Sequence, residues 1–417
     1  MKRSATPTGP RGRRGSLLKS FAPGDRRRFV LPAAWGGRVR GAEPGHAGTV
    51  CDAEVPSRLH ASVIDMNRFD VGLPGGGGLG FGVALFCRAR VAVTTSTRIE
   101  VSGTRPAMAL HLAELFRTLA SFRGGVEIEV EDHGRHHMGL GSSIGTLSAT
   151  AIALNEALGR PLGLRDLRKL IAHNYCEEAP GDPNRLVPAF ETNVGAMVAI
   201  HGGMVVASDG CELVCRIPMP DSMRALLVLP RLAPKATSGQ KEAEALLTRA
   251  RTLDRADAQL KAYRVLMDLL PAMMRGDIDG IGDVVYQLAS LGSKRAECGL
   301  HGSDGDEIYE ALARLRAEGA EIGSMSSVGP AVFALSCRPE VWARWGSWKD
   351  RGDAAYTLEV PVDNLGARVR LDGAPIPYRL EPWWTEPAFG APQRTPARAA
   401  RRSHGMAPPG PPSILPS

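Results

Sequence analysis

A short glycine- and serine-rich stretch, GLGSS, consists of Gly139, Leu140, Gly141, Ser142 and Ser143 and leads directly into a helical pattern. Glycine lets a ligand approach the backbone closely, and the helix would direct its N-terminal amides and the positive end of its dipole at the loop. The serines add hydroxyl groups. The stretch therefore predicts a phosphate or diphosphate site, with an ordinary turn and a serine N-cap as the alternative. It matches neither a P-loop nor the GxGxxG fingerprint.

A second stretch of this kind lies far along the chain, where GSMSSVGPAVFAL at residues 323–335 predicts a strand, a turn and a strand. Ser326 and Ser327 fall in the turn, where they would close the phosphate site from the C-terminal half of the chain. Ser238 and Gly239 open a further helix and predict a second anion site. Plain helix capping is the alternative for this last pair.

Several charged side chains are candidate ligands for phosphate, carboxylate or metal groups. Basic residues pair with phosphates and carboxylates, and the candidates are Arg185, Lys235 and Lys241. Taken alone, each of these residues is more often an ordinary surface charge. Asp304 and Asp306 are candidate Mg²⁺ ligands, with solvated turn acids as the alternative.

Composition limits the classes of function. The chain has 417 residues, 43% of them hydrophobic, which is enough for two packed domains. The net charge of +7 is concentrated in residues 1–50 and 391–417, so the middle is mildly acidic and nucleic-acid binding is not expected. No apolar run reaches the roughly 18 residues of a membrane span. Seven cysteines without a CxxC pair predict neither a disulfide framework nor a zinc site, and favour a cytoplasmic protein.

Strand and helix patterns alternate along the chain. Hydrophobicity alternates in residues 91–103 and 124–132, which predicts strands, whereas residues 144–158 carry a helical stripe. Residues 193–207 predict a hairpin with a Gly-Gly turn, and helices dominate 239–318. Antiparallel turn signatures among helices predict an α+β fold with two lobes.

The domain organisation follows from changes in composition. Residues 1–54 and 385–417 are rich in Gly, Pro, Ala and Arg without periodicity, and predict disordered tails. Between them, residues 55–215 form the predicted first lobe, which carries the phosphate loop. Residues 216–384 form the predicted second lobe.

The two glycine–serine stretches, in this order, resemble the second and third motifs of the GHMP kinase superfamily. The region before them resembles a non-kinase branch, β-ribofuranosylaminobenzene 5′-phosphate synthase, whose members begin with RLHxxxIDxN and GGxGL. Here this pattern is carried by Arg58, Leu59, His60, Ile64, Asp65, Asn67, Gly76, Gly77, Gly78 and Leu79. The HxGLGS and SSxGP motifs of the branch begin at His137 and Ser326. The resemblance covers roughly residues 57–360, and is strongest to the C-nucleoside synthases of formycin and pyrazofurin biosynthesis.

The resemblance implies a two-lobed GHMP-kinase-like fold, with a ribosomal-S5-domain-2-like N-terminal lobe and a ferredoxin-like C-terminal lobe. It also implies a cytoplasmic homodimer that acts on small molecules. The implied reaction is a decarboxylating ribosyl transfer from phosphoribosyl pyrophosphate (PRPP) with Mg²⁺. An electron-rich aromatic carbon attacks the anomeric carbon, pyrophosphate leaves, and the ring loses a carboxylate as CO2.

Roles for the site residues follow from the same resemblance. His60, Asp65 and Asn67 would act at the acceptor or the ribose, and Gly77, Gly78 and His137 would bind the acceptor. The two glycine–serine loops would hold the donor phosphates, together with the second anion site and Arg185 and Lys241.

Three functions compete on the sequence. An aminopyrazole dicarboxylate is the first candidate acceptor, p-aminobenzoate of the methanopterin pathway is the second, and the third reading is a small-molecule kinase. Arg135 replaces the proline that kinases carry before the loop, and Val328 replaces a tryptophan of the methanopterin enzymes. An altered acceptor pocket would explain the second change and would favour the pyrazole, and a changed reaction is the alternative explanation.

Overall fold

The computed structural model describes residues 19–31, 45–136, 138–231, 240–301, 305–350, 352 and 354–378. Several sequence-predicted site residues lie outside this set: His137, Lys235, Ser238, Gly239 and Asp304. The backbone of Lys241 lies in a helix, but its side chain is not described.

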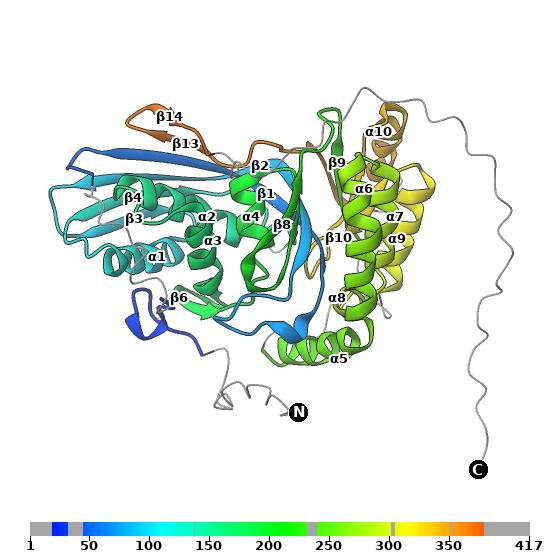
Figure 1. The fold of residues 1–417 in the computed structure, drawn as a ribbon, viewed down its shortest axis with the longest axis horizontal. Coiled ribbons are helices and arrows are strands. Elements are labelled where there is room, and N and C mark those ends of the chain that lie inside the picture. The colour runs from blue at the N-terminus through cyan, green and yellow to red at the C-terminus, as the bar shows by residue number, and fades with distance from the viewer. Residues whose placement is uncertain are drawn as a thin grey trace, which may run out of the picture. The chain divides into compact units, whose positions relative to one another are not determined.

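An eight-stranded sheet organises the first lobe (Figure 1). Its main path runs β14-β13-β1-β2-β4-β3, and β7 and β8 continue from β2. The strands are β1 (Val50–Val63), β2 (Gly78–Thr94), β3 (Ile99–Gly103), β4 (Gly125–Glu131), β7 (Met204–Ala207), β8 (Leu213–Ile217), β13 (Arg368–Leu371) and β14 (Ala374–Ile376). The pairing of β3 with β4 is parallel and the other described pairings in this sheet are antiparallel. The strands expected within residues 91–103 and 124–132 are confirmed.

Helices cover one face of this sheet, and the lobe's main core lies between the two layers. They are α1 (Pro106–Leu119), α2 (Ser142–Ala157), α3 (Leu164–His173) and α4 (Val194–His201), beside a small hairpin of β5 (Cys176–Ala179) and β6 (Asp182–Pro188). The predicted helix after GLGSS is α2, and every one of its residues is buried. Its Ala, Ser, Thr and Gly residues let it pack closely on all sides rather than along one stripe.

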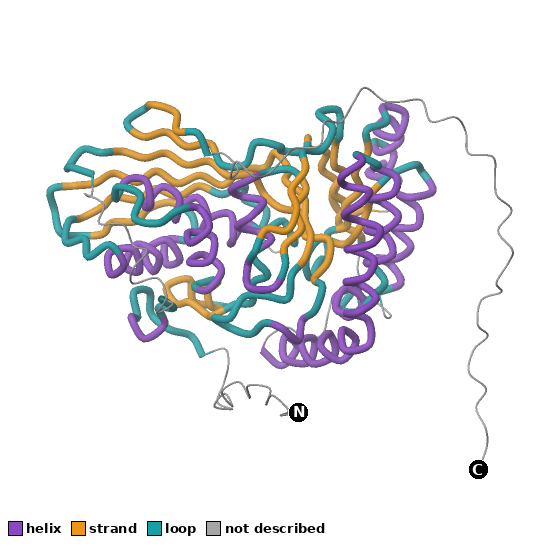
Figure 2. The backbone as a smooth tube through the Cα atoms, in the orientation of Figure 1, coloured by secondary structure: helices purple, strands orange, loops and turns teal. Residues whose placement is uncertain are grey.

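The second lobe has a four-stranded antiparallel sheet in the order β10-β11-β9-β12. Its strands are β9 (Arg224–Pro230), β10 (Ile322–Met325), β11 (Val332–Ser336) and β12 (Ala354–Pro361). Its helices are α5 (Gln240–Arg264), a π-helical turn (Val265–Leu269), α6 (Leu270–Arg275), α7 (Ile278–Leu288), α8 (Gly292–Cys298), α9 (Asp306–Ala317), α10 (Pro339–Trp345) and α11 (Ser347–Asp350). Figure 2 shows these helices gathered beside the strands. The order and connections are those of a ferredoxin-like lobe, so the predicted α+β two-lobed fold is confirmed.

The last two strands return to the first lobe. β13 pairs with β1, with Cys51 opposite Leu371, and β14 adds to β13. The predicted boundary between the lobes at residue 215 falls inside β8, a strand of the first sheet. In addition, β13 and β14 belong to the first sheet although they lie in the region predicted as the second lobe. Among the described helices, none is both long and apolar enough to cross a membrane.

The hairpin expected at residues 193–207 is wrong in its first half. Residues 194–201 form α4, and only Met204–Ala207 is a strand. Every residue of α4 is buried and all but the last, His201, are apolar or glycine, so the segment carries neither the helical nor the strand period.

The tail expected over residues 1–54 is also wrong in part, because Val50 begins β1 and residues 19–31 pack on the first lobe. Phe21 pairs with Leu186 of β6 through two backbone hydrogen bonds of 2.8 and 2.9 Å. The backbone N–H of Gly24 donates to Nδ1 of His111 on α1 at 3.1 Å. The His111 ring lies between those of Phe21 and Phe29, each with its centroid 5.1 Å away.

We therefore expect Phe21→Ala to lower the free energy of unfolding by about 3 kcal/mol, because it removes a buried ring from this contact. Urea unfolding of the full chain would measure the loss. Leu31→Ala is the matched control, since Leu31 lies in the same segment but is exposed. Equal midpoints for wild type and Phe21→Ala would show that the segment does not contribute to folding.

Candidate active site

Three segments that are far apart in the sequence meet beside His60 of β1. The Ser326 hydroxyl accepts a hydrogen bond from the His60 backbone N–H at 3.1 Å and donates one to the Gly139 carbonyl at 2.6 Å. The Ser327 N–H donates to the His60 carbonyl at 2.9 Å. The two glycine–serine loops are thus held against each other and against β1.

Arg58, two residues before His60, ties the same loops together. Its Nη1 donates to the Gly139 carbonyl at 3.0 Å, and its Nη2 donates to the Ser327 hydroxyl at 3.3 Å. Lys294 of α8 supports the second loop from the other side, since its Nζ donates to the Ser327 carbonyl at 2.7 Å. The junction therefore joins elements of both lobes.

The first loop can take this path only with glycine at two positions. Gly139 has a φ of +77°, and a Cβ there would lie 2.2 Å from the Ser326 carbonyl oxygen. Gly141 has a φ of +73° and directly precedes α2, where a Cβ would lie 3.0 Å from Cγ of Arg58. Both conformations are strained for other residues, and the first would also break the contact between the loops.

A cavity of about 450 Å³ opens at this junction, and its lining divides into two groups. Around the first loop the lining is polar and cationic: Arg58, Arg105, Arg135, Ser142 and Ser143. A second group of lining residues belongs to one apolar cluster: Val63, Met66, Phe69, Phe190, Leu246 and Leu247. The Phe69 and Phe190 rings meet edge to face with centroids 6.0 Å apart. The cavity thus offers an anion-binding region and a region suited to a flat apolar ring.

Burial controls the ionisation of the titratable groups in the lining. Burial, with the nearby charges of Arg58 and Lys294, holds the pKa of His60 well below its ordinary value, so its imidazole is neutral at pH 7. Its Nε2 lies 3.4 Å from the Thr192 hydroxyl. Burial raises the pKa of Glu191 and of Glu297. The neutral imidazole can donate or accept a hydrogen bond but does not add a cation to the site.

Arg105 is a lining residue that the sequence analysis missed. It lies immediately before α1, and its Nη2 donates to the Ser142 hydroxyl at 3.1 Å. Its side chain is 6% exposed and its Nε lies 3.3 Å from the Asp132 carboxylate. The available signal was an arginine followed by Pro106 at a helix start, but nothing local indicated that it would reach a loop 37 residues away.

Other predicted residues have contacts outside the cavity lining. Asp65 caps a short 3₁₀ turn (Met66–Arg68) by accepting from the Asn67 N–H at 2.9 Å, and the Asn67 amide donates to the Arg251 carbonyl at 3.0 Å. Arg185 donates to Ser20 on the N-terminal segment. These contacts give each of the three a structural role.

The remaining predicted residues support the fold around the site. At Gly77, a Cβ would lie 2.7 Å from the Ala207 carbonyl oxygen, and at Gly78, 3.2 Å from His60 Nε2. They therefore allow close strand packing behind His60. Asp306 is exposed at the start of α9. Within the described part of the chain, no three His, Cys, Asp or Glu side chains gather closely enough to hold a metal ion.

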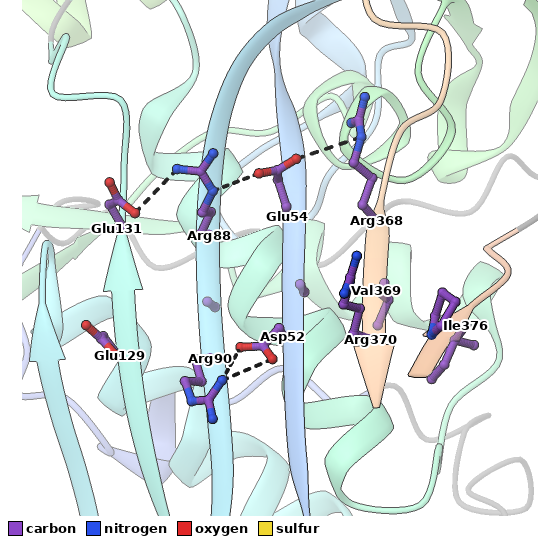
Figure 3. Close-up of a pocket in the computed structure, with 13 residues that line it drawn as sticks. Asp52, Glu54, Arg88, Arg90, Glu129, Glu131, Arg368, Val369, Arg370 and Ile376 are labelled. Carbon is purple, nitrogen blue, oxygen red and sulfur yellow. Dashed lines mark hydrogen bonds and ion pairs between the residues drawn. The ribbon is translucent and has the colours of Figure 1, made fainter. Parts of the chain in front are cut away.

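A larger hollow of about 730 Å³ lies on the open face of the first sheet (Figure 3). Ion pairs run across its strands, from Glu131 to Arg88, from Arg88 to Glu54 and from Glu54 to Arg368. Asp52 and Arg90 form a parallel pair at 2.8 Å. Because these side chains pair with one another across neighbouring strands, the hollow reads as a solvated sheet face rather than a reaction site.

Comparisons with known proteins show which sequences this chain resembles. The sequence profile of the GHMP kinases N terminal domain matches residues 107–183. A β-ribofuranosylphenol 5′-phosphate synthase of Archaeoglobus fulgidus is 25% identical over 302 residues, which is 67% of this chain and 86% of the relative. A homoserine kinase of Moorella thermoacetica is 26% identical over 320 residues, 71% of this chain and 95% of the relative.

The fold likewise has solved counterparts. The crystal structure of mevalonate diphosphate decarboxylase from Staphylococcus aureus matches with a TM-score of 0.55 and 15% identity, over 77% of this chain and 98% of that chain. At this identity the match shows a shared fold.

We expect Gly139→Ala to destabilise the protein more than a substitution that only imposes left-handed strain. Gly134→Ala is the matched control, because Gly134 has a φ of +69° but open space around its Cα. The control should lose about 1 kcal/mol and Gly139→Ala about 1–3 kcal/mol more, from its clash with the Ser326 carbonyl. Urea unfolding would measure both, and equal losses would contradict the tight docking of the two loops.

The neutral His60 predicts how stability changes with pH. Its pKa is depressed in the folded state, so the unfolded chain binds a proton that the folded chain does not. The unfolding free energy should therefore fall as the pH decreases below about 6.5, and His60→Gln should make this fall shallower. Unfolding titrations between pH 7.5 and about 5 would show it. Exposed His46, changed to Gln, is the control, and identical slopes for His60→Gln and wild type would refute the assignment.

Proposed function

We propose that this chain, a member of the GHMP superfamily in the β-ribofuranosylphenol 5′-phosphate synthase branch, is a decarboxylating C-ribosyltransferase. The donor is PRPP. The acceptor is an aromatic amino-carboxylate, and 4-amino-pyrazole-3,5-dicarboxylate is our first candidate. The products are a C-nucleoside 5′-phosphate, CO2 and pyrophosphate.

The main support for this proposal is that the cavity lining has a cationic part and an apolar part. A ribosyl donor with a diphosphate leaving group matches the cationic region around the first loop. A flat heteroaromatic ring matches the apolar region of Phe69, Phe190 and Met66. His60 lies in the same lining as a neutral hydrogen-bonding group, where it can orient the ribose or the ring without repelling positive charge.

The chemistry needs stabilised charge rather than a protein nucleophile. The bond between the anomeric carbon and the diphosphate oxygen breaks with its electron pair on the diphosphate, so positive charge develops on the ribose. The ring carbon then forms the new C–C bond, and CO2 leaves its electron pair behind to restore the aromatic ring. Fixed amides of the loop and the N-terminal end of α2 are placed to stabilise the negative charge on the departing group.

Mg²⁺ enters this scheme with the donor. Mg²⁺ is commonly bound by substrate phosphates with only one or two carboxylates. The described lining contains single carboxylates, such as Glu177 and Glu191, rather than a cage of acids, and so fits a metal brought by the diphosphate.

Two other activities have specific support. The relatives' name specifies a phenol product, which favours p-hydroxybenzoate as acceptor, because p-aminobenzoate would give an aminobenzene product instead. Similarity to homoserine kinases favours phosphoryl transfer from ATP to a small alcohol. An aromatic acceptor agrees with the phenylalanine-lined region, whereas homoserine has no ring to place there.

Mass spectrometry of parallel reactions would test the proposal. PRPP and Mg²⁺ would be combined with the aminopyrazole dicarboxylate, p-aminobenzoate or p-hydroxybenzoate, and one further reaction would contain ATP and homoserine. We expect a ribosylated pyrazole that has lost one CO2, with an equal amount of pyrophosphate. Ribosylation of a benzoate alone would assign the other acceptor, and consumption of ATP alone would assign a kinase.

The loop should be necessary for the rate. Ser142→Ala combined with Ser143→Ala should lower turnover about 100-fold, on the scale of a lost donor to a developing anion. Ser148→Ala is the matched control, because Ser148 is buried on the same helix but does not line the cavity. Unchanged turnover in the double variant would remove the loop hydroxyls from the mechanism.

A further inference from the structure

Two guanidinium groups bracket the first loop inside the cavity. Arg58 contacts its beginning through the Gly139 carbonyl, and Arg105 contacts its end through the Ser142 hydroxyl. Both line the cavity. They come from different elements, β1 and the segment before α1, so the fold rather than the local sequence brings them to the two ends of one loop.

Arg105 is buried in a way that calls for a ligand-facing role. Its side chain is 6% exposed and still contributes to the cavity wall. Asp132, whose side chain is fully buried, fixes the Nε edge at 3.3 Å and also lies 2.7 Å from His136 Nε2. The Nη1 atom has longer contacts, 3.8 Å to the Glu178 carboxylate and 3.9 Å to the Met108 sulfur. Asp132 thus orients the Arg105 guanidinium so that its Nη2 atom faces the first loop.

Arg58 supplies a second indication that the cavity binds an anion. Its Nε is buried and has no hydrogen-bond partner among the described residues, although Nη1 and Nη2 are both used. A buried donor without a partner is unfavourable unless a ligand or water satisfies it. An oxyanion in the cavity is the ligand chemistry that such a donor favours.

We propose that Arg58 and Arg105 together bind the two phosphate groups of the donor's diphosphate, with Arg105 at the α2 end of the loop. The inference rests on the proposed function for the identity of the donor. The inference adds to the proposed function by assigning the binding of the leaving group to the two arginines at the ends of the first loop. With one arginine for each phosphate group, such a pair should favour a diphosphate over a single phosphate.

A purely structural role for Arg105 makes a different prediction. If Arg105 only clamps Ser142 to Asp132, its removal lowers stability and leaves anion affinity unchanged in the protein that still folds. If it binds the leaving group, its removal weakens diphosphate binding more than orthophosphate binding. The two roles therefore separate in the affinities.

Isothermal titration of the full chain with inorganic diphosphate and with orthophosphate, each with Mg²⁺, would test the assignment. Arg105→Gln should weaken diphosphate binding roughly 10- to 100-fold, the loss expected for a charge-assisted hydrogen bond. Orthophosphate affinity should change less, and Arg105→Lys should recover part of the diphosphate affinity. Arg117→Gln is the matched control, because Arg117 lies on α1 but contacts Glu114 and the Thr97 carbonyl outside the cavity.

Thermal unfolding keeps the test decisive if Arg105→Gln is less stable. Saturating diphosphate should raise the melting temperature of wild type and of Arg117→Gln, and that increase should shrink in both Arg105 variants. An undiminished increase, or an unchanged dissociation constant, in Arg105→Gln would overturn the assignment.

The same measurements separate this inference from the proposed function. Diphosphate binding that depends on Arg105, in a protein that ribosylates none of the acceptors, would keep the arginine pair and reject the ribosyl transfer. Ribosyl transfer with diphosphate affinity independent of Arg105 would do the reverse.

Discussion

The contact between the Ser326 hydroxyl and the Gly139 carbonyl is the constraint on which the site depends. One hydroxyl joins β1, the first loop and the second loop, because it accepts from His60 and donates to Gly139. The approach is possible only because Gly139 has no side chain. Arg58 contacts both loops at this junction, and α2 begins directly after the first loop.

Charge is distributed differently in the two hollows of the molecule. On the open face of the first sheet, acids and arginines alternate between neighbouring strands and satisfy each other. In the cavity, burial keeps His60 neutral, and the buried Nε donor of Arg58 has no hydrogen-bond partner among the described residues. Charges that pair with each other leave little for a ligand to bind, whereas a buried donor that the described residues do not satisfy can bind a substrate. This difference, more than the size of either hollow, is why we propose the smaller one as the reaction site.

Local signals in the sequence were enough to predict much of this structure. The loop with Gly139 and Gly141, the helix that follows, the strand at 125–131 and the turn at Ser326 all have characteristic residues or periods within a few positions. Arg105 could not be predicted, because its role depends on a tertiary contact with Ser142. The largely apolar α4 lacked a period, and the packing of Phe21 depends on a strand 165 residues away, so composition alone suggested a tail.

The return of β13 to β1 also has a consequence for biosynthesis. The edge of β1 that faces β13 carries backbone groups that stay unpaired until residues 368–371 have left the ribosome. The first lobe, although it begins the chain, is therefore completed almost last, and its nascent form must avoid edge-to-edge association while the second lobe is made. A first lobe made without residues 368–371 would have an open edge at β1 that favours aggregation, so residues 368–371 belong in any expressed form of this lobe.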